Sequence, residues 1–412
     1  MSASDFIKCL LLEPLNDFQV SLRDHVIQFY KLCGKRIAVQ SLAERFTPSA
    51  VSFIQRLLNQ QMQRKVIVSE VKEILKRFSS IYVQDSTRFT LPANMVDMFD
   101  GYGGAISSDS IANIQFCYEV KRGEIAHLQL NDGSYQDQTA AREDLPDLQS
   151  GALIIRDLGY YALDVLQKIH HFKAYFISRL KPKVTLYEKR DNKWVKLNLK
   201  KIKNELKKKN INFLEKTVWL GKELPVRLYI SLAPAEVTER RLRKTNKHNK
   251  GKGHQTSSAY KDYAALNLFI TNVDDQLLST QDIPKLYRLR WQIELIFKTW
   301  KSYYQIHELK NVNPYRILCY IYSSLLLLLL HWNIFHAFNH IHYEEHKQWL
   351  SVQKFAKAMM QSLHEQDIWF DTTDKTLIED YLFDLYQLCS EHMRLEKRKK
   401  RINYDDLIQI LK

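Results

Sequence analysis

The sequence predicts an α/β fold with helices at both ends and most of its strands in the middle. Three observations support this prediction. Apolar residues recur at three- and four-residue steps up to about residue 78, alternate with polar residues in short segments from Ser80 onward, and return to helical spacing after Ile283. The 412 residues include only 11 Gly and 9 Pro, which excludes collagen-like and low-complexity chains.

Helical spacing near the N-terminus is clearest in residues 21–32, 39–46 and 48–58. The second and third segments, within SLAERFTPSAVSFIQRLL, resemble a helix-turn-helix, whose second helix enters the major groove of DNA. A packed pair of helices is the more common structure for such a pattern, so both interpretations stay open at this stage.

Strands are predicted in five places before residue 180, namely 80–85, 111–120, 124–130, 152–155 and 174–177. The second and third are joined by Lys121-Arg-Gly123, which is typical of a hairpin. A helix is expected between the last two strands, over residues 161–170. Asp85 ends the first strand and Asp157 closely follows the fourth, so two acids are expected at the ends of buried strands.

The positive charge is concentrated in one segment. The whole chain carries a net charge of +15, and residues 181–250 contain 21 Lys or Arg but only seven Asp or Glu, which accounts for 14 of these charges. Surfaces of soluble proteins normally mix both signs, so this excess indicates contact with a polyanion, and nucleic acid is the first candidate. The run Lys207, Lys208 and Lys209 is expected to contact DNA. A smaller basic cluster spans Lys397–Arg401.

Within this segment, short strands are predicted over residues 184–187, 194–199 and 226–232. A basic helix is expected over about 235–244, followed by a mobile loop over 245–254 because that tract is polar and contains Gly.

Residues 283–304 predict one amphipathic helix with an unusual polar face. At about 100° per residue, Tyr287, Arg290 and Lys301 fall within an arc of about 60° around Glu294. The opposite face is apolar and consists of Leu289, Ile293, Ile296 and Trp300. A surface helix with an Arg290–Glu294 ion pair would be the ordinary explanation of this pattern.

The upstream acids favour a different explanation. Burying Asp85 and Asp157 at strand ends costs free energy unless a cation compensates their charge. Together with Glu294 they would form a set of oxygen ligands suited to Mg²⁺ or Mn²⁺. Two such ions about 3.5–4 Å apart activate a nucleophile and stabilise the leaving oxygen of a phosphodiester. The sequence therefore predicts metal-dependent phosphoryl transfer on nucleic acid, with Asp85, Asp157 and Glu294 as catalytic metal ligands.

Other site classes are disfavoured. The five cysteines are widely spaced, which indicates neither a disulfide framework nor a zinc finger, and fits a reducing cytosol. The apolar run 317–330 is shorter than the about 20 residues that span a bilayer, so we expect a buried core helix and no membrane partner. Four closely spaced histidines are expected on a polar helix surface rather than on a metal: His336, His340, His342 and His346.

The motifs resemble those of the insertion-sequence-four family of bacterial DDE transposases. Tyr287-x2-Arg290-x3-Glu294-x6-Lys301 matches the family's Y-R-E-K signature. Asp85-Ser-Thr87 and Asp157-Leu-Gly-Tyr160 resemble its two aspartate motifs. The resemblance covers roughly residues 40–335.

The resemblance implies a fold and a domain order. It implies an RNase H-like catalytic core, a mixed sheet flanked by helices, with an inserted β-rich basic domain and a helical N-terminal region. The expected parts are a DNA-binding N-terminal region (1–78), two core segments (79–180 and 281–345), the insertion (181–280) and a helical C-terminal region (346–412).

The resemblance also implies cut-and-paste transposition by hydrolysis and transesterification through a DNA hairpin, performed by a homodimer on transposon ends and target DNA. It implies Asp85, Asp157 and Glu294 as ligands of two metal ions, and Tyr287, Arg290 and Lys301 as groups that hold phosphates. A Trp of the insertion would stack on a flipped base; the candidates are Trp194 and Trp219, and a position in the core is the alternative for either. No small-molecule substrate is expected, and the place of action would be the bacterial cytoplasm, on the nucleoid.

Two other functions remain open from the sequence. The chain could be a structure-selective nuclease on the same fold, or a non-catalytic DNA-binding protein derived from a transposase. Tyr287 as a covalent nucleophile, as in tyrosine recombinases, is disfavoured because that mechanism needs no acid triad.

Overall fold

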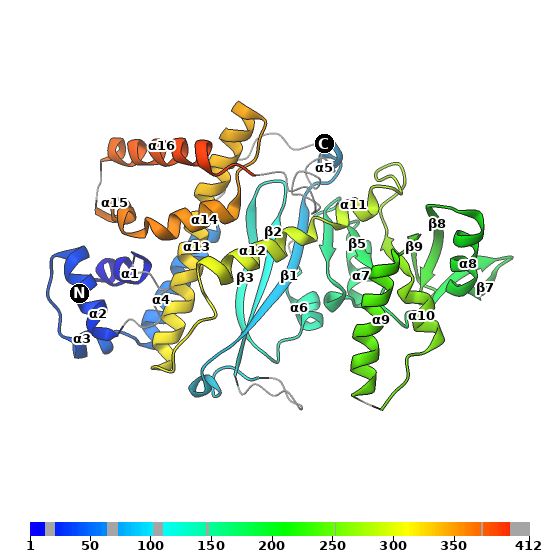
Figure 1. The fold of residues 1–412 in the computed structure, drawn as a ribbon, viewed down its shortest axis with the longest axis horizontal. Helices are drawn as coiled ribbons and strands as arrows, with labels where there is room; N and C mark the ends of the chain where they lie inside the picture. The colour runs from blue at the N-terminus through cyan, green and yellow to red at the C-terminus, as the bar shows by residue number, and fades with distance from the viewer. Residues whose placement is uncertain are drawn as a thin grey trace. The chain divides into compact units, whose positions relative to one another are not determined.

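The computed structural model describes residues 1–12, 21–63, 73–101, 110–145, 148–251, 253–371 and 374–395 (Figure 1). The chain divides into two compact units, each assembled from separate segments. The first unit contains the described residues within 1–70, 86–135 and 292–405, and the second contains those within 71–85 and 136–291. The basic cluster Lys397–Arg401 lies outside the described residues.

The strands are hydrogen-bonded in the order β3-β2-β1-β4-β5-β10-β9-β8-β6-β7. The first five in this order are β3 (Glu124–Asp132), β2 (Ile111–Glu119), β1 (Ile81–Thr90), β4 (Leu153–Arg156) and β5 (Tyr175–Arg179). β1 is parallel to β4 and β4 to β5, whereas β2 and β3 form the antiparallel hairpin predicted from Lys121-Arg-Gly123. With its flanking helices, this mixed sheet confirms the predicted α/β class with an RNase H-like core.

Helices of the second unit pack against β5. α7 (Leu163–His171) leads from β4 to β5 and contacts β5 through a buried apolar face formed by Val165, Leu166 and Ile169. The shorter helical elements nearby are α5 (Glu73–Lys76), α6 (Asp137–Glu143), η2 (Leu158–Tyr160) and α11 (Ile283–Tyr287).

The basic segment extends the sheet with antiparallel strands. β10 (Leu266–Thr271) pairs with β5, and the order continues through β9 (Leu224–Leu232), β8 (Phe213–Leu220), β6 (Leu186–Arg190) and β7 (Lys193–Lys196). Three helices accompany these strands, namely α8 (Leu199–Lys209), α9 (Ala235–Lys250) and α10 (Ser258–Ala264). The sequence analysis missed both β8 and α8. α8 nevertheless carries a start signal, because the Asn198 Oδ1 accepts a hydrogen bond from the Lys201 N–H at 3.0 Å.

The prediction of a mobile loop that begins at residue 245 is wrong, because α9 continues to Lys250. Its polar side chains are used for hydrogen bonds to the following segment. The Thr245 Oγ1 donates to the Tyr260 hydroxyl at 2.8 Å, and the Asn249 Nδ2 donates to the Thr256 Oγ1 at 3.0 Å. These contacts to a segment beyond the turn stabilise a helix that local composition does not favour.

The first unit is mainly helical. Its N-terminal helices are α1 (Ala3–Leu12), α2 (Leu22–Cys33), α3 (Val39–Ala43) and α4 (Pro48–Met62), which confirms the helices predicted there. α4 begins where expected because the Thr47 Oγ1 accepts a hydrogen bond from the Ala50 N–H and Pro48 occupies the first turn. The remaining elements are η1 (Ala93–Met95), α12 (Arg290–Tyr303), α13 (Pro314–His346), α14 (Val352–Gln361), η3 (Leu363–Asp367), α15 (Ile368–Asp371) and α16 (Lys375–His392).

α13 is the central helix of the first unit, and α1 and α4 pack against it. The prediction of a buried core helix is confirmed, since Leu325 to Leu329 are each at most 3% exposed. Among the described residues, α13 is the one helix long and apolar enough to cross a bilayer, and 67% of its most apolar stretch is buried inside the protein. The prediction that the four histidines lie on a polar helix surface is wrong for His342. This residue is 0% exposed because α13 is covered on most sides.

His331 on α13 is the centre of a buried hydrogen-bond chain. Its Nδ1 lies 2.8 Å from the Tyr304 hydroxyl and its Nε2 lies 2.8 Å from the Gln366 Oε1. The Gln366 Nε2 donates to the Met359 carbonyl, so the amide oxygen is the atom that faces His331. A neutral imidazole satisfies both contacts, as donor to Gln366 and as acceptor from Tyr304.

We expect His331 to make the protein acid-sensitive. Burial lowers its pKa from 6.5 to about 4. Between these values the unfolded chain binds a proton that the folded chain does not, so the free energy of unfolding should fall as the pH drops, by at most about 3 kcal/mol. Urea unfolding at about pH 7 and about pH 5 measures this loss. His331→Gln should flatten the pH dependence, whereas the control His340→Gln should not; equal slopes in both variants would contradict the assignment.

Candidate active site

Asp85 lies within β1, at the point where the pairing of β1 with β4 ends, and Asp157 directly follows β4. The predicted strand end at Asp85 is therefore wrong, because β1 continues to Thr90 along its other neighbour, β2. β1 and β4 are paired with Gln84 opposite Arg156, so the two acids occupy the next position of the same register. Because side chains alternate between faces along a strand, residues at matching positions point to one face. The Asp85 side chain is 17% exposed and that of Asp157 is 44% exposed. The fold therefore brings together the two acids that the sequence placed at strand ends.

Arg290 connects these two carboxylates. Its Nη1 donates a hydrogen bond to the Asp85 Oδ2 at 2.8 Å, and its Nε lies 3.9 Å from the Asp157 Oδ1. A guanidinium group between two carboxylates offsets their mutual repulsion and the cost of removing them from water. Helical spacing alone suggested only Glu294 as a partner of Arg290, so its contacts with Asp85 and Asp157 were missed.

Tyr287 completes this group in the second unit. Its hydroxyl donates to the Asp157 Oδ1 at 3.5 Å, and its ring packs against Phe269 with centroids 5.1 Å apart. The side chain is 8% exposed, and burial raises the pKa of the phenol well above its ordinary value. The phenol is therefore protonated at neutral pH and positioned as a hydrogen-bond donor, which does not suit a nucleophilic phenolate.

The prediction of one continuous helix over 283–304 is wrong, because the chain forms two helices there. α11 ends at Tyr287 and α12 begins at Arg290. Between them the backbone tightens, with the Arg288 N–H bonded to the Lys285 carbonyl and the Trp291 N–H bonded to the Arg288 carbonyl, each three residues back. The calculated position of Tyr287 on a single helical face therefore does not hold, although Glu294 still follows Arg290 by about one turn of α12.

Glu294 and Lys301 lie in the first unit, on the part of α12 that begins at Gln292. Glu294 is exposed. The Lys301 Nζ donates to the Arg88 carbonyl on β1 at 3.0 Å, and burial lowers the pKa of this ammonium group. The apolar face predicted for this helix is confirmed, since Ile293, Ile296 and Trp300 are at most 4% exposed. Phe116 on β2 packs on Trp300 with centroids 5.0 Å apart, which fixes the rotation of α12 within the first unit.

The surroundings of Asp157 explain why the residue two positions later, Gly159, is a glycine. A Cβ at Gly159 would come within 2.4 Å of the Asp137 Oδ2, so a larger residue there would force the Asp137 carboxylate to move. The preceding Arg156 is 6% exposed, and its Nη1 donates to the Ala141 carbonyl on α6 at 3.2 Å. The sequence analysis missed Asp137, because nothing in its spacing indicates this close approach.

The donor set of the second unit fits a divalent cation. Asp85 and Asp157 offer carboxylate oxygens, occupy matching positions on adjacent strands and already bind a cationic group, Arg290. Within the described ranges, no three His, Cys, Asp or Glu side chains form a cluster that could hold a metal ion. Two of the three predicted ligands therefore lie together in one unit, and the third, Glu294, lies on α12 in the other.

Cationic side chains of the second unit are gathered on two helices. Lys207, Lys208 and Lys209 are exposed at the end of α8, and Lys209 pairs with Glu205 at 2.9 Å. α9 buries no residue and is anchored by Arg241, whose Nη1 donates to the carbonyls of Ala264 and Leu266. On the exposed side of α9, five cations fall within an arc of about 120°: Arg240, Arg243, Lys244, Lys247 and Lys250. α9 was not singled out from the sequence as a DNA contact.

The two tryptophans of the insertion belong to one aromatic cluster at β7. Trp194 and Trp219 have ring centroids 5.5 Å apart, and Tyr187 lies 6.4 Å from Trp194. Trp194 is 37% exposed and Lys189 lies over its ring at 5.9 Å. Trp194 is therefore not a core residue, and aromatic rings beside cations are typical of surfaces that bind single nucleic-acid strands.

Comparison with known proteins decides the family. A family model described as Transposase DDE domain matches residues 76–330, a range that includes every residue of the candidate site discussed above. The chain belongs to this family. The transposase for insertion sequence element IS231B of Bacillus thuringiensis subsp. berliner is 30% identical over 393 residues, which cover 90% of this chain and 81% of that protein. The IS231E transposase of Bacillus thuringiensis subsp. finitimus is 28% identical and covers 93% of this chain and 83% of its own length.

The transposase for insertion sequence element IS1151 of Clostridium perfringens is 26% identical over 351 residues, covering 80% of this chain and 73% of that protein. Among solved structures, a cryo-EM structure of the piggyBac transposase synaptic complex with hairpin DNA aligns with a TM-score of 0.44 and 10% identity. That alignment covers 93% of this chain and 75% of the other.

The family assignment confirms that the protein is a bacterial insertion-sequence DDE transposase. It is an enzyme that cleaves DNA and depends on a divalent metal ion, which the family requires. The two alternatives left open by the sequence, a structure-selective nuclease and a non-catalytic derivative, are less consistent with relatives that match over most of their length.

Proposed function

We propose that this transposase moves an insertion sequence by cut-and-paste transposition, with Asp85, Asp157 and Glu294 as the catalytic metal ligands. The observation that supports this most strongly is the placement of Asp85 and Asp157 at matching positions where the pairing of the parallel strands β1 and β4 ends, around one cationic group. Glu294 is the third ligand because it occupies the glutamate position of the Y-R-E-K signature. Two Mg²⁺ or Mn²⁺ ions, when bound, supply an activated water or 3′-hydroxyl and stabilise the leaving oxygen.

The protein's own groups then hold and orient the DNA. Arg290 offers a planar, bidentate fork for a phosphate and Lys301 a point charge. They are 11 residues apart on α12, about 16 Å along its axis, so we assign them to different phosphates. The Tyr287 hydroxyl donates a hydrogen bond to Asp157 and so fixes the orientation of that carboxylate.

The proposed reaction nicks the element end, and the freed 3′-hydroxyl attacks the opposite strand to form a hairpin, which is reopened before joining to target DNA. We propose a homodimer acting on paired ends, in the bacterial cytoplasm on nucleoid DNA. The N-terminal region 1–78 and the insertion 181–280 are the proposed DNA-binding parts, and a Trp of the insertion, Trp194 or Trp219, stacks on a flipped base. These assignments rest on the motif resemblance and on the cationic and aromatic surfaces described above.

The hairpin is tested with the full-length protein and an end-labelled duplex carrying the element's terminus. Denaturing electrophoresis separates nicked strand, hairpin and joined product. We expect a hairpin band that appears after the nick and before the joined product. Joined product without any hairpin would retain transposition but reject this route, whereas cut ends that are never joined would reject strand transfer itself.

The lysine run on α8 is expected to account for part of the salt-sensitive binding. Each phosphate contact contributes a slope of about −0.9 in log K against log salt, so replacing Lys207, Lys208 and Lys209 by Gln should flatten the slope by up to roughly three units. Fluorescence anisotropy of a labelled duplex at several salt concentrations measures this slope. The matched control removes three exposed lysines outside the basic segment, Lys310, Lys357 and Lys375. If both triple variants change the slope equally, the run on α8 makes no specific contact.

A further inference from the structure

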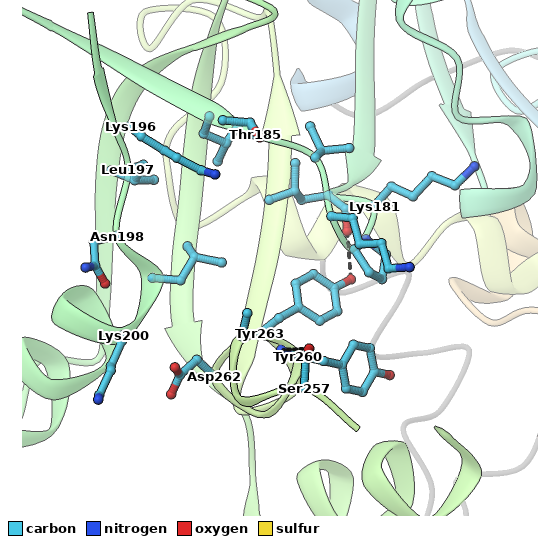
Figure 2. A pocket seen from close by; sticks show the side chains of 17 residues that line it. Lys181, Thr185, Lys196, Leu197, Asn198, Lys200, Ser257, Tyr260, Asp262 and Tyr263 are labelled. Carbon is cyan, nitrogen blue, oxygen red and sulfur yellow. Dashed lines mark hydrogen bonds between the residues drawn. The ribbon is translucent and has the colours of Figure 1, made fainter. Parts of the chain in front are cut away.

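A cavity in the insertion is separate from the carboxylate site. It has a volume of about 530 Å³ and lies between the loop from Leu180 to Leu186, the segment from Lys196 to Lys200, and one face of α10 (Figure 2). This volume is within the range of about 300–1,000 Å³ typical of small-molecule sites. All of its lining residues belong to the second unit. We call it the α10 pocket.

The α10 pocket is built rather than incidental. The Tyr263 hydroxyl donates to the Leu180 carbonyl at 2.7 Å and ties α10 to the loop, as the dashed line in Figure 2 shows. The Leu197 N–H donates to the Leu186 carbonyl at 2.9 Å and joins the other two walls. Lys183 in the loop has a φ of 69°, a left-handed conformation that costs free energy for a residue other than Gly. The walls are therefore fixed relative to one another by specific contacts.

The charge of the α10 pocket selects an anion. Four lysines line it, namely Lys181, Lys183, Lys196 and Lys200. Its one acidic lining residue, Asp262, is 8% exposed and already forms an ion pair with Lys203 of α8. None of the four lining lysines is in an ion pair with another residue of the described chain. In Figure 2 the Lys196 side chain lies beside Thr185, away from Tyr260 and Tyr263.

The remaining lining suits a flat, partly apolar body. Leu180, Pro182, Val184 and Leu186 form an aliphatic wall. The lining that α10 contributes is aromatic. Tyr260 and Tyr263 both line the pocket, and their ring centroids are 5.7 Å apart. Asn198 uses its carbonyl oxygen to cap α8, which leaves its amide N–H₂ as a donor at the rim. An anionic phosphate joined to a planar, hydrogen-bonding base matches these three kinds of surface.

We infer that the α10 pocket binds a single nucleotide, with its phosphate at the lysines and its base against Tyr260 and the aliphatic wall. The nucleotide has two sources with the same chemistry, an unpaired residue of bound DNA or a free mononucleotide. The structure favours DNA, since two of the three walls of the pocket, with all four of its lysines, belong to the segment that carries nearly all the net positive charge. Only this choice of source rests on the proposed function.

The test uses the full-length protein and two fluorescent duplexes, one blunt and one with a single-stranded overhang containing 2-aminopurine. Stacking of one base is worth about five-fold to 150-fold in affinity, so wild type should prefer the overhang by at least about five-fold. Val184→Trp fills the cavity without changing the charge and should abolish the preference. The double variant Lys196→Gln with Lys200→Gln, at exposed positions that tolerate substitution, should abolish it as well.

The matched control, Lys207→Gln with Lys208→Gln, removes the same charge from α8 outside the cavity. It should weaken both duplexes by one common factor and keep the preference for the overhang. Absence of any preference in wild type, or its persistence in both pocket variants, would exclude bound DNA as the source, and either result without binding of dAMP would overturn the inference. Cleavage of an element end is measured in parallel on wild type, so a failed pocket leaves the proposed function standing and a failed cleavage reaction leaves the pocket testable.

Free nucleotide is the second arm. Isothermal titration with dAMP, and with decanoate as an anion that lacks a base, separates the sources. Binding of the overhang without binding of dAMP assigns the pocket to DNA, and binding of dAMP that is lost in Val184→Trp assigns it to mononucleotides; both support a nucleotide site. Decanoate binding in the absence of any dAMP or overhang effect would overturn it in favour of an aliphatic anion.

Discussion

Replacing any one of Asp85, Asp157 or Glu294 by its amide is expected to reduce strand cleavage by about 10³-fold or more. Loss of one carboxylate ligand removes several kcal/mol of transition-state stabilisation, and about 4 kcal/mol corresponds to this factor. Binding to the element end should change less than about three-fold, because the cationic surfaces on α8 and α9 are untouched. Cleavage of a labelled end in Mg²⁺ or Mn²⁺, with binding measured separately, checks both expectations.

The control for these variants is Asp164→Asn. Asp164 lies on α7 in the second unit and pairs at the surface with Arg142, so its loss removes an acid without touching the strand ends. This variant should cleave as wild type does. EDTA should stop cleavage by wild type completely. A Glu294→Gln protein that still cuts at a normal rate would show that Glu294 is not the third ligand.

Arg290→Ala is expected to separate the first cut from the later steps. Nicking should fall by less than about five-fold, whereas hairpin formation and joining should fall by about 10²-fold or more, because a charge-assisted bidentate contact that holds the cut strand is lost. Arg290→Lys should lie in between, since an ammonium keeps the charge but not the fork. Nicked, hairpin and joined products are quantified on intact and pre-nicked ends.

The contacts of Arg290 also predict an effect on thermal stability, which gives a second test of its role. Its guanidinium offsets the charges of Asp85 and Asp157, so metal-free Arg290→Ala should unfold at a lower temperature than wild type, and added Mg²⁺ should recover part of the loss. Lys298→Ala, an exposed position on α12, is the control and should leave stability and every product unchanged. A uniform loss of nick, hairpin and joined product in Arg290→Ala, restored in proportion by Mg²⁺, would assign Arg290 to support of the carboxylates alone.

Much of the fold follows from local pattern. The alternation around Lys121-Arg-Gly123 was sufficient for the β2–β3 hairpin, and the long apolar run was sufficient for the core of α13. The elements that were missed depend on distant contacts. α9 extends past Lys244 because Thr245 and Asn249 bond to residues beyond the turn, and composition alone reports only that these side chains are polar. The interruption before Arg290 similarly accompanies burial of Tyr287 against Phe269, a strand residue.

The candidate site shows the same division. The need for a cation beside the two acids was predictable, because an acid beside a buried strand requires a compensating group. The end of the first strand was not, because β1 continues past Asp85 to Thr90. The identity of that cation was not predictable either, since Arg290 is 205 residues from Asp85 along the chain. The α10 pocket was beyond prediction for a related reason. Its walls come from three segments, and the polar groups that hold them are backbone carbonyls and N–H groups, which leave no trace in the sequence.

The pairing of β5 with β10 has an evolutionary consequence. Arg179 is opposite Phe269 and Ile177 is opposite Thr271, so the polypeptide leaves the catalytic sheet and returns to it on adjacent strands. Insertions whose two ends lie side by side are exchanged and shortened with little disturbance to the host domain. Residues 180–265 can therefore diverge, or be replaced by the corresponding segment of a relative, while Asp85 and Asp157 keep their register. A transposase with this arrangement can therefore alter the insertion, the part proposed to bind DNA, without altering its catalytic residues. The same junction is a suitable place for grafting a different segment in an engineered recombinase.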